Sequence, residues 1–180
     1  MNLLFHFFLI HFLADYPLQP NKLVQMKKKG YLGVLLHCCV HLATLLVVLM
    51  PFLGNNKVLV GIAVIFVTHN IIDQTKIALD KKYPKCRLYF YLLDQFTHLV
   101  IVTSVAFYIG TVSMPSCELY SNQSVVLYAL VLILSTFFYD VTAYFIKTRN
   151  KPAPYKRNYK LMYWNAIIAT IGFMVYWLAY

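Results

Sequence analysis

Charged side chains are scarce in this sequence. Asp, Glu, Lys and Arg make up 12% of its 180 residues, whereas an average soluble domain carries about 25%. Hydrophobic residues make up 61% of the chain, and the mean hydropathy is +0.63. The composition therefore excludes an ordinary soluble domain and indicates a protein that is embedded in a membrane.

Acidic residues are the rarest charges, with 6 Asp and Glu against 16 Lys and Arg. Because Glu118 is the only glutamate, the HExxH signature of zinc metalloproteases is absent. The four cysteines form no CxxC and no paired spacing, so neither a thiolate zinc site nor a disulfide framework is indicated. We interpret Cys38 and Cys39 as small core residues. No internal repeat or long linker divides the chain, which indicates one integral membrane domain over 1–180.

Six apolar segments account for most of the sequence. The last five are long enough to cross a hydrocarbon core of about 30 Å, which needs about 20 helical residues. The first ends before Asp15 and Pro17 and reaches only about 20 Å as a helix. The segments predict an all-α polytopic membrane helix bundle with five full spans plus a short N-terminal span or half-inserted helix. They cover 2–14 and about 31–53, 58–79, 88–112, 125–146 and 161–179.

Basic residues alternate between the connections of these segments. The first, third and fifth connections hold nearly all of them, whereas the other two hold only Lys57. The positive-inside rule places the basic connections in the cytoplasm and the C-terminus outside. This topology, together with attraction to anionic lipids, explains the net charge of +10. No nucleic-acid-binding motif accompanies the basic residues, so we expect membrane lipid and no nucleic acid as partner. The sequence names no protein partner.

Titratable residues recur in pairs four positions apart inside the apolar segments. Positions i and i+4 lie on one face of a helix, one turn apart. Ionisable groups inside a membrane are costly and mark a functional site by default. With the topology above, four segments place their pairs at one depth, about 10 Å below the cytoplasmic surface at 1.5 Å per residue. The pairs are His11 and Asp15, His37 and His41, His69 and Asp73, and Asp94 and His98.

Imidazole and carboxylate are the usual protein ligands of zinc, iron and manganese. We therefore expect all eight residues to ligate one or two divalent transition-metal ions, with zinc favoured over iron and manganese. With a single ion, the remaining carboxylates would orient the histidines. A carboxylate that does not ligate, Asp15 or Asp94, would act as catalytic base, and Lys76 would stabilise developing negative charge.

Structural explanations remain open for the same residues. His37 and His41 could be hydrogen-bonded core histidines, and Asp73 could form a buried ion pair with Lys76. His11 and Asp15 could cap the edge of the membrane. His6 lies nearer the opposite membrane face and is interpreted as a packing or interfacial residue. Asp140 is expected to be a partner for the basic end of its segment rather than a ligand.

These motifs resemble a bacterial family of small integral membrane proteins known only as a domain of unknown function. The resemblance covers about residues 5–100 and implies the bacterial cytoplasmic membrane, but no established activity. The pattern is also loosely similar to predicted membrane-bound metal-dependent hydrolases. The motifs are His11, Asp15, Leu18 and Gln19; His37 and His41; His69, Asp73 and Lys76; and Asp94, Gln95 and His98.

The function expected from these features is metal-dependent hydrolysis of a lipid or lipid-linked substrate at the cytoplasmic leaflet. A bound metal activates water as the nucleophile. A metal-ion or proton transporter is the first alternative and would need polar groups across both halves of the membrane. A di-iron lipid oxidase is the second, although the HxxHH clusters usual in such enzymes are missing.

Overall fold

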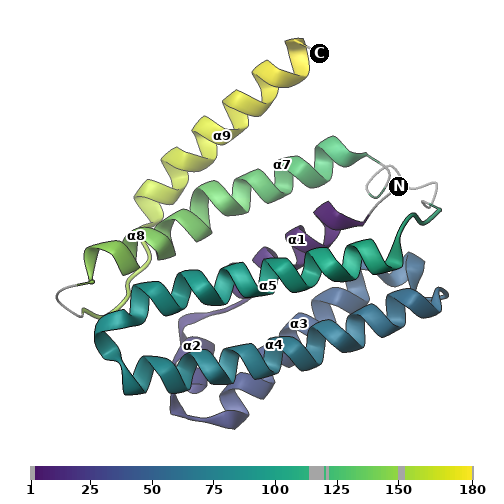
Figure 1. The fold of residues 1–180 in the computed structure, drawn as a ribbon. Coiled ribbons are helices and arrows are strands. Elements are labelled where there is room, and N and C mark those ends of the chain that lie inside the picture. Colours follow the sequence, from purple (N-terminus) through teal and green to yellow (C-terminus); the bar gives the residue numbers. More distant parts are fainter. Residues whose placement is uncertain (1–2, 114–119, 121, 150–152, 180) are drawn as a thin grey trace.

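The structure, a computed structural model, describes residues 3–113, 120, 122–149 and 153–179. Cys117 and Glu118 lie outside the described residues. The described chain is helical, which confirms the all-α prediction (Figure 1). Its helices are α1 (Leu4–Asp15), α2 (Asn21–Lys29), α3 (Tyr31–Val48), α4 (Asn56–Lys82), α5 (Arg87–Ile109), α7 (Gln123–Ile133), α8 (Tyr139–Lys147) and α9 (Tyr159–Ala179), with short turns η1 (Met50–Phe52), η2 (Pro84–Cys86) and η3 (Leu134–Phe138).

Within the part of the chain that the structure describes, five helices are long and apolar enough to cross a membrane, as predicted. They comprise α3, α4, η2 with α5, the continuous run from α7 through η3 to α8, and α9. Helix α1 has 12 residues and is apolar but shorter. The third helix ends at Val48, earlier than predicted, because Pro51 lies in the 3-10 turn that follows it.

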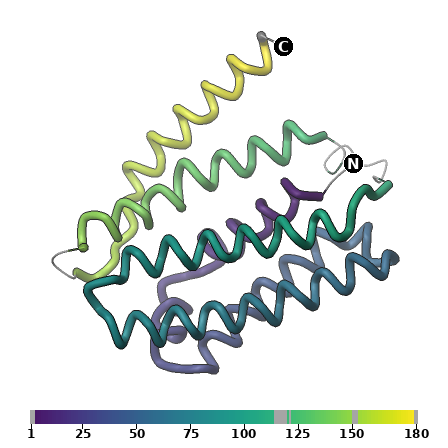
Figure 2. Tube along the Cα trace, viewed as in Figure 1, coloured from purple at the N-terminus to yellow at the C-terminus, as the bar shows by residue number. Residues whose placement is uncertain are grey.

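The short helix α1 lies among the long ones. It packs against α3, α5 and α7, so most of its side chains are buried or partly buried (Figures 1 and 2). One apolar core joins α1, α3, α4 and α5, and it fills the part of the bundle near the start of α1 and the end of α5. Its members include Leu3, Phe7, Leu45, Leu49, Phe52, Val58, Ile62, Val105 and Ile109.

Helix α2 was expected to be a basic connection, and the structure shows a helix there instead. Pro20 precedes it and Gly30 follows it, and no glycine or proline interrupts it. The chain then turns back, so that α2 lies beside the start of α3 (Figure 2). A Cβ added to Gly33 would lie 2.1 Å from the carbonyl carbon of Met26. The absence of a side chain at Gly33 therefore lets α2 pack closely against α3.

The last two spans flank the first part of the bundle. A π turn, η3, joins α7 to α8, and the Asn165 side-chain amide donates to the Ser135 carbonyl at 2.7 Å. Helix α9 packs against α7 and η3 and projects away from the other helices (Figure 1). Most of its apolar side chains are exposed, including Ile168 and Leu178, which suits a lipid-facing helix.

Candidate metal centre

The four predicted pairs converge in the structure. Asp15 ends α1, His37 and His41 lie on α3, and the other two pairs lie on α4 and α5. Seven of the eight side chains are buried. The side chain of Asp15 is nearly so, at 10% exposed. Three of the four helices are long spans, and the fourth, α1, is enclosed by its neighbours.

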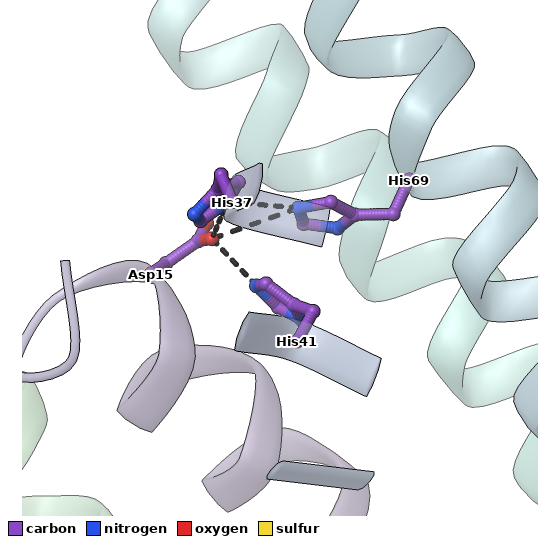
Figure 3. Close-up of side chains that lie close together, drawn as sticks. All are labelled: Asp15, His37, His41 and His69. Atoms are coloured by element: carbon purple, nitrogen blue, oxygen red, sulfur yellow. Dashed lines mark hydrogen bonds and ion pairs between the residues drawn. The ribbon is translucent and has the colours of Figure 1, made fainter. Parts of the chain in front are cut away.

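Asp15 lies at the centre of the first group (Figure 3). Its Oδ1 lies 2.7 Å from His41 Nε2, 3.1 Å from His37 Nε2 and 3.8 Å from His69 Nε2. The Nε2 atoms of His37 and His69 are themselves 3.1 Å apart. Three imidazole nitrogens and one carboxylate oxygen therefore point toward a common position, drawn from α1, α3 and α4.

The histidines have more close neighbours than hydrogen bonds allow. His37 Nε2 lies near Asp15, His69 and Asp73, although a ring nitrogen carries at most one proton. His11 Nε2 and both ring nitrogens of His98 are buried and have no hydrogen-bond partner among the described residues. Because buried polar atoms are normally paired, this arrangement is poorly explained as a set of hydrogen-bonded core histidines.

A second group shares Asp15 with the first. Its Oδ2 lies 3.7 Å from His11 Nε2, and the rings of His11 and His98 have centroids 5.1 Å apart. His11, Asp15 and His98 offer three ligand atoms within 4.8 Å of one another, and so do Asp73, Asp94 and His98. The two oxygens of Asp15 thus face two different sets of histidines.

Amides support the cluster from outside. The Gln19 side-chain nitrogen lies 2.8 Å from His37 Nδ1, and that of Gln95 lies 3.3 Å from Asp15 Oδ2 and 3.1 Å from Asp94 Oδ2. Such contacts fix the orientation of potential ligands. Gln19 and Gln95 both belong to the motifs that the sequence pairs with the candidate ligands.

The ion pair of Asp73 differs from the one considered from the sequence. Lys27 Nζ of α2 lies 2.7 Å from Asp73 Oδ2, whereas Lys76 Nζ pairs with Asp80 at 3.1 Å. Burial alone would lower the pKa of Lys27, but the carboxylates of Asp73 and Asp15 outweigh it and raise that pKa. Lys27 is therefore held as a buried cation beside the cluster.

A cavity of about 430 Å³ adjoins the cluster. Asp15, Asp73, Asp94 and Gln95 line it, whereas the candidate histidines lie behind these carboxylates. Lys76 also lines the cavity. Any molecule in the cavity would therefore meet the carboxylate side of the cluster.

His6 and Asp140 lie away from this position, whereas Cys38 Sγ lies within 4.8 Å of ligand atoms of His69 and Asp73. His6 is buried and stacks on Tyr120, in agreement with a packing role. Asp140 accepts from the Tyr155 hydroxyl at 2.7 Å and from the Asn158 backbone at 3.3 Å, so it anchors the segment before α9. Cys38 is buried as expected, whereas Cys39 is exposed and the core interpretation is wrong for it.

Sequence reasoning missed two cations that the fold brings to the site. Lys27 looked like one basic residue of a connection, and only the amphipathic pattern of α2 could have indicated that it faces inward. The Arg157 guanidinium donates to the backbone carbonyls of Tyr16 and Gln19 at 2.9 and 3.2 Å. No local pattern links Arg157 to residues so distant in the chain.

Residues 3–128 match the family described as Protein of unknown function (DUF3307). Since the match covers more than half of the chain, the protein belongs to this family, and the resemblance found from its motifs is confirmed. No curated protein and no solved structure matches the chain. The matched range includes all eight candidate ligands and ends before α8 and α9.

Proposed function

We propose that this member of the family is an intramembrane metal-dependent hydrolase that acts on a lipid or lipid-linked substrate at the cytoplasmic leaflet. The observation that carries the proposal is the convergence of buried imidazoles and carboxylates from α1, α3, α4 and α5 at the floor of a cavity. A hydrolase needs this combination of potential metal ligands and space for a substrate beside them.

The spacing of the first group suits a tetrahedral ion. Bonds of about 2.0–2.1 Å to nitrogen or oxygen place tetrahedral ligand atoms about 3.3 Å apart. Four of the six separations among the ligand atoms of Asp15, His37, His41 and His69 range from 2.7 to 3.8 Å, which brackets that value, and all six are within 4.8 Å. Zinc is the favoured ion for three histidines and one carboxylate, and iron or manganese would also accept them.

A second ion would use the group that shares Asp15. His11 and His98 supply nitrogens there, and Asp73 and Asp94 lie on the other side of His98. The unpartnered ring nitrogens of His11 and His98 support this role. One or two ions per chain are therefore proposed, with Asp15 as the ligand common to both.

The cavity residues have distinct proposed roles. A metal held by these residues would supply activated water as the nucleophile and would polarise the bond to be cleaved. Asp94 is favoured over Asp15 as the base that accepts a proton, because Asp15 is engaged by three histidines and Asp94 Oδ1 has no hydrogen-bond partner among the described residues. Lys76 lines the same space and would stabilise negative charge that develops on the substrate.

The charge distribution supports a cytoplasmic position for the cavity. Its lining includes Lys28, Lys81 and Arg87, which belong to the basic connections that the positive-inside rule assigns to the cytoplasm. The protein would then lie in the bacterial cytoplasmic membrane with its C-terminus outside. Labelling of single cysteines at positions 28 and 121 tests this topology, since only the first should react from the cytoplasm. The opposite labelling pattern would reverse the orientation.

Transport is less well supported than hydrolysis. The core beyond the cluster is apolar, and it includes Leu45, Ile62 and Val105. The hydroxyls of Thr44 and Ser104 bond to carbonyls of their own helices, at 2.8 Å each, rather than forming a polar path. The polar groups therefore gather at one end of the bundle, whereas a transporter needs them across both halves.

Turnover by purified protein in lipid nanodiscs tests the proposal. Metal-loaded wild type should hydrolyse a phospholipid or a polyprenyl phosphate, and chelation should abolish the activity. Asp94→Asn and Asp73→Asn should lose turnover, whereas Asp140→Asn, which removes a buried carboxylate outside the cluster, should retain it at equal folded concentration. Wild-type rates in both cluster variants would refute the site. Movement of metal ions or protons in proteoliposomes without any hydrolysis would favour the transporter.

A further inference from the structure

The cavity carries cations that the rest of the protein does not neutralise. Lys27 and Lys76 are ion-paired, and Arg157 is bound to two carbonyls. Lys28, Lys81 and Arg87 also line the cavity, and none of the three forms a hydrogen bond or ion pair with a residue that the structure describes. Three free cations thus face a space whose floor is the candidate metal centre.

These cations come from different helices and lie close together. Lys76 Nζ and the Arg87 guanidinium both lie over the ring of Phe145, 5.7 and 5.9 Å from its centroid. Lys28 lies at the end of α2, and burial together with the nearby charges of Arg87 and Lys76 lowers its pKa. Like charges gathered in this way repel one another, so an anion between them would be bound favourably.

One wall of the cavity is apolar and aromatic. Phe137, Val141 and Phe145 line it from η3 and α8, and Ile77 lines it from α4. The helices that carry these residues are apolar enough to lie in a membrane. A ligand that fills the cavity would therefore need an anionic end for the cations and an apolar part for this wall.

We propose that the cavity binds an amphiphile with a terminal phosphate group, and that Lys28 and Arg87 hold the phosphate while the hydrocarbon lies along Phe137 and Val141. A terminal phosphate carries about −1.5 to −2 charges near pH 7 and has three acceptor oxygens. The planar guanidinium of Arg87 suits such oxygens in a bidentate contact, and the ammonium of Lys28 supplies a second charge. Six cationic side chains and four carboxylates line the cavity, so the extra cation of a zwitterionic headgroup would meet a net positive charge.

That this amphiphile is a substrate rests on the proposed hydrolase function. Its binding does not, because binding is measured separately from turnover. The probes are dioctanoyl phosphatidic acid, dioctanoylglycerol, which has the same chains without the phosphate, and inorganic phosphate. Binding is measured by calorimetry on the metal-loaded protein in detergent, with metal content and thermal unfolding recorded for each variant.

Matched lysine substitutions provide the control. Lys28→Gln and Arg87→Gln should each weaken binding of dioctanoyl phosphatidic acid about tenfold or more, because each removes a charge-assisted contact. Lys29→Gln and Lys85→Gln remove the same charge from neighbours that do not line the cavity, and should change binding less than about twofold because they make no contact with a ligand inside it. Equal weakening in all four variants would overturn the proposal.

The other probes identify the part of the ligand that is recognised. Dioctanoylglycerol should bind weakly and equally to all variants. Inorganic phosphate should bind at least about a hundredfold more weakly than phosphatidic acid, because it buries no hydrocarbon. Phosphate that binds as tightly as the lipid would overturn the amphiphile and indicate a site for the free anion.

Failure of binding and failure of hydrolysis are distinguishable. Variant-dependent binding without turnover in wild type would uphold the phosphate site and contradict the hydrolase. Turnover of lipids without any dependence on Lys28 or Arg87 would uphold the hydrolase and overturn the phosphate site.

Discussion

The ion pair between Lys27 and Asp73 makes the stability of the fold depend on helix α2. Its atoms lie 2.7 Å apart, and the two side chains are 14% and 5% exposed. At an effective dielectric constant of about 20, unit charges at this distance attract by about 6 kcal/mol, and desolvation offsets part of that. Lys27→Met keeps the aliphatic stem but leaves Asp73 as a buried, unpaired carboxylate. We predict that it lowers the free energy of unfolding of metal-free protein by about 3–5 kcal/mol.

A double-mutant cycle isolates the pair. Asp73→Asn alone leaves Lys27 unpaired, whereas Lys27→Met with Asp73→Asn leaves no charge behind. The double variant should therefore cost at least about 2 kcal/mol less than the sum of the two single variants. Reversible unfolding by SDS in bicelles gives the free energy of unfolding of the wild type, the two single variants and the double variant after chelation. Lys22→Met, which changes an exposed lysine of the same helix, serves as the control.

The same variant also reports on the metal. If an ion binds beside Asp73, it compensates the carboxylate, so Lys27→Met should cost less in metal-loaded than in metal-free protein. Strictly additive costs in the cycle would show that the pair does not couple. If Lys27→Met lowers the free energy of unfolding equally with and without metal, Asp73 does not lie beside a bound ion.

Three further outcomes follow from the described contacts. Lys76→Met should leave the metal content unchanged and slow turnover about 10²-fold, because it removes charge stabilisation. Elemental analysis and rate measurements on the same preparation test this. A loss of metal in this variant would instead give the lysine a structural role. Gly33→Ala should lower the unfolding free energy by about 1–3 kcal/mol, because its Cβ would meet the backbone of α2. Gly172→Ala, whose Cβ would meet nothing within 4 Å, should not. Arg157→Ala should destabilise by about 1–3 kcal/mol through loss of two bonds to carbonyls, and Lys156→Ala should have little effect, as thermal unfolding would show.

The membrane architecture and the convergence of the pairs follow from the sequence because both depend on local patterns. Runs of about 20 apolar residues define the spans. Spacing of four positions places His37 and His41 on one face of α3, and the alternation of basic connections brings the pairs of different helices to one depth. The structure places the eight residues within one buried region.

The remaining features depend on packing between distant segments. The inward position of Lys27 requires the close approach of α2 to α3 at Gly33, and this depends on the tertiary turn rather than on α2 alone. Arg157 reaches carbonyls more than a hundred positions earlier in the chain. The exposure of Cys39 depends on which face of α3 meets α4, which apolar composition alone does not determine.

Metal content is the most direct test of the proposed centre. Wild-type protein purified gently in detergent should contain one or two transition-metal ions per chain by elemental analysis, and His6→Ala should retain them because His6 lies outside the cluster. His37→Ala/His41→Ala should lose the metal and fail to regain it when zinc, iron or manganese is added. A wild type that contains no more metal than this double variant, both as purified and after metal addition, would contradict the metal centre.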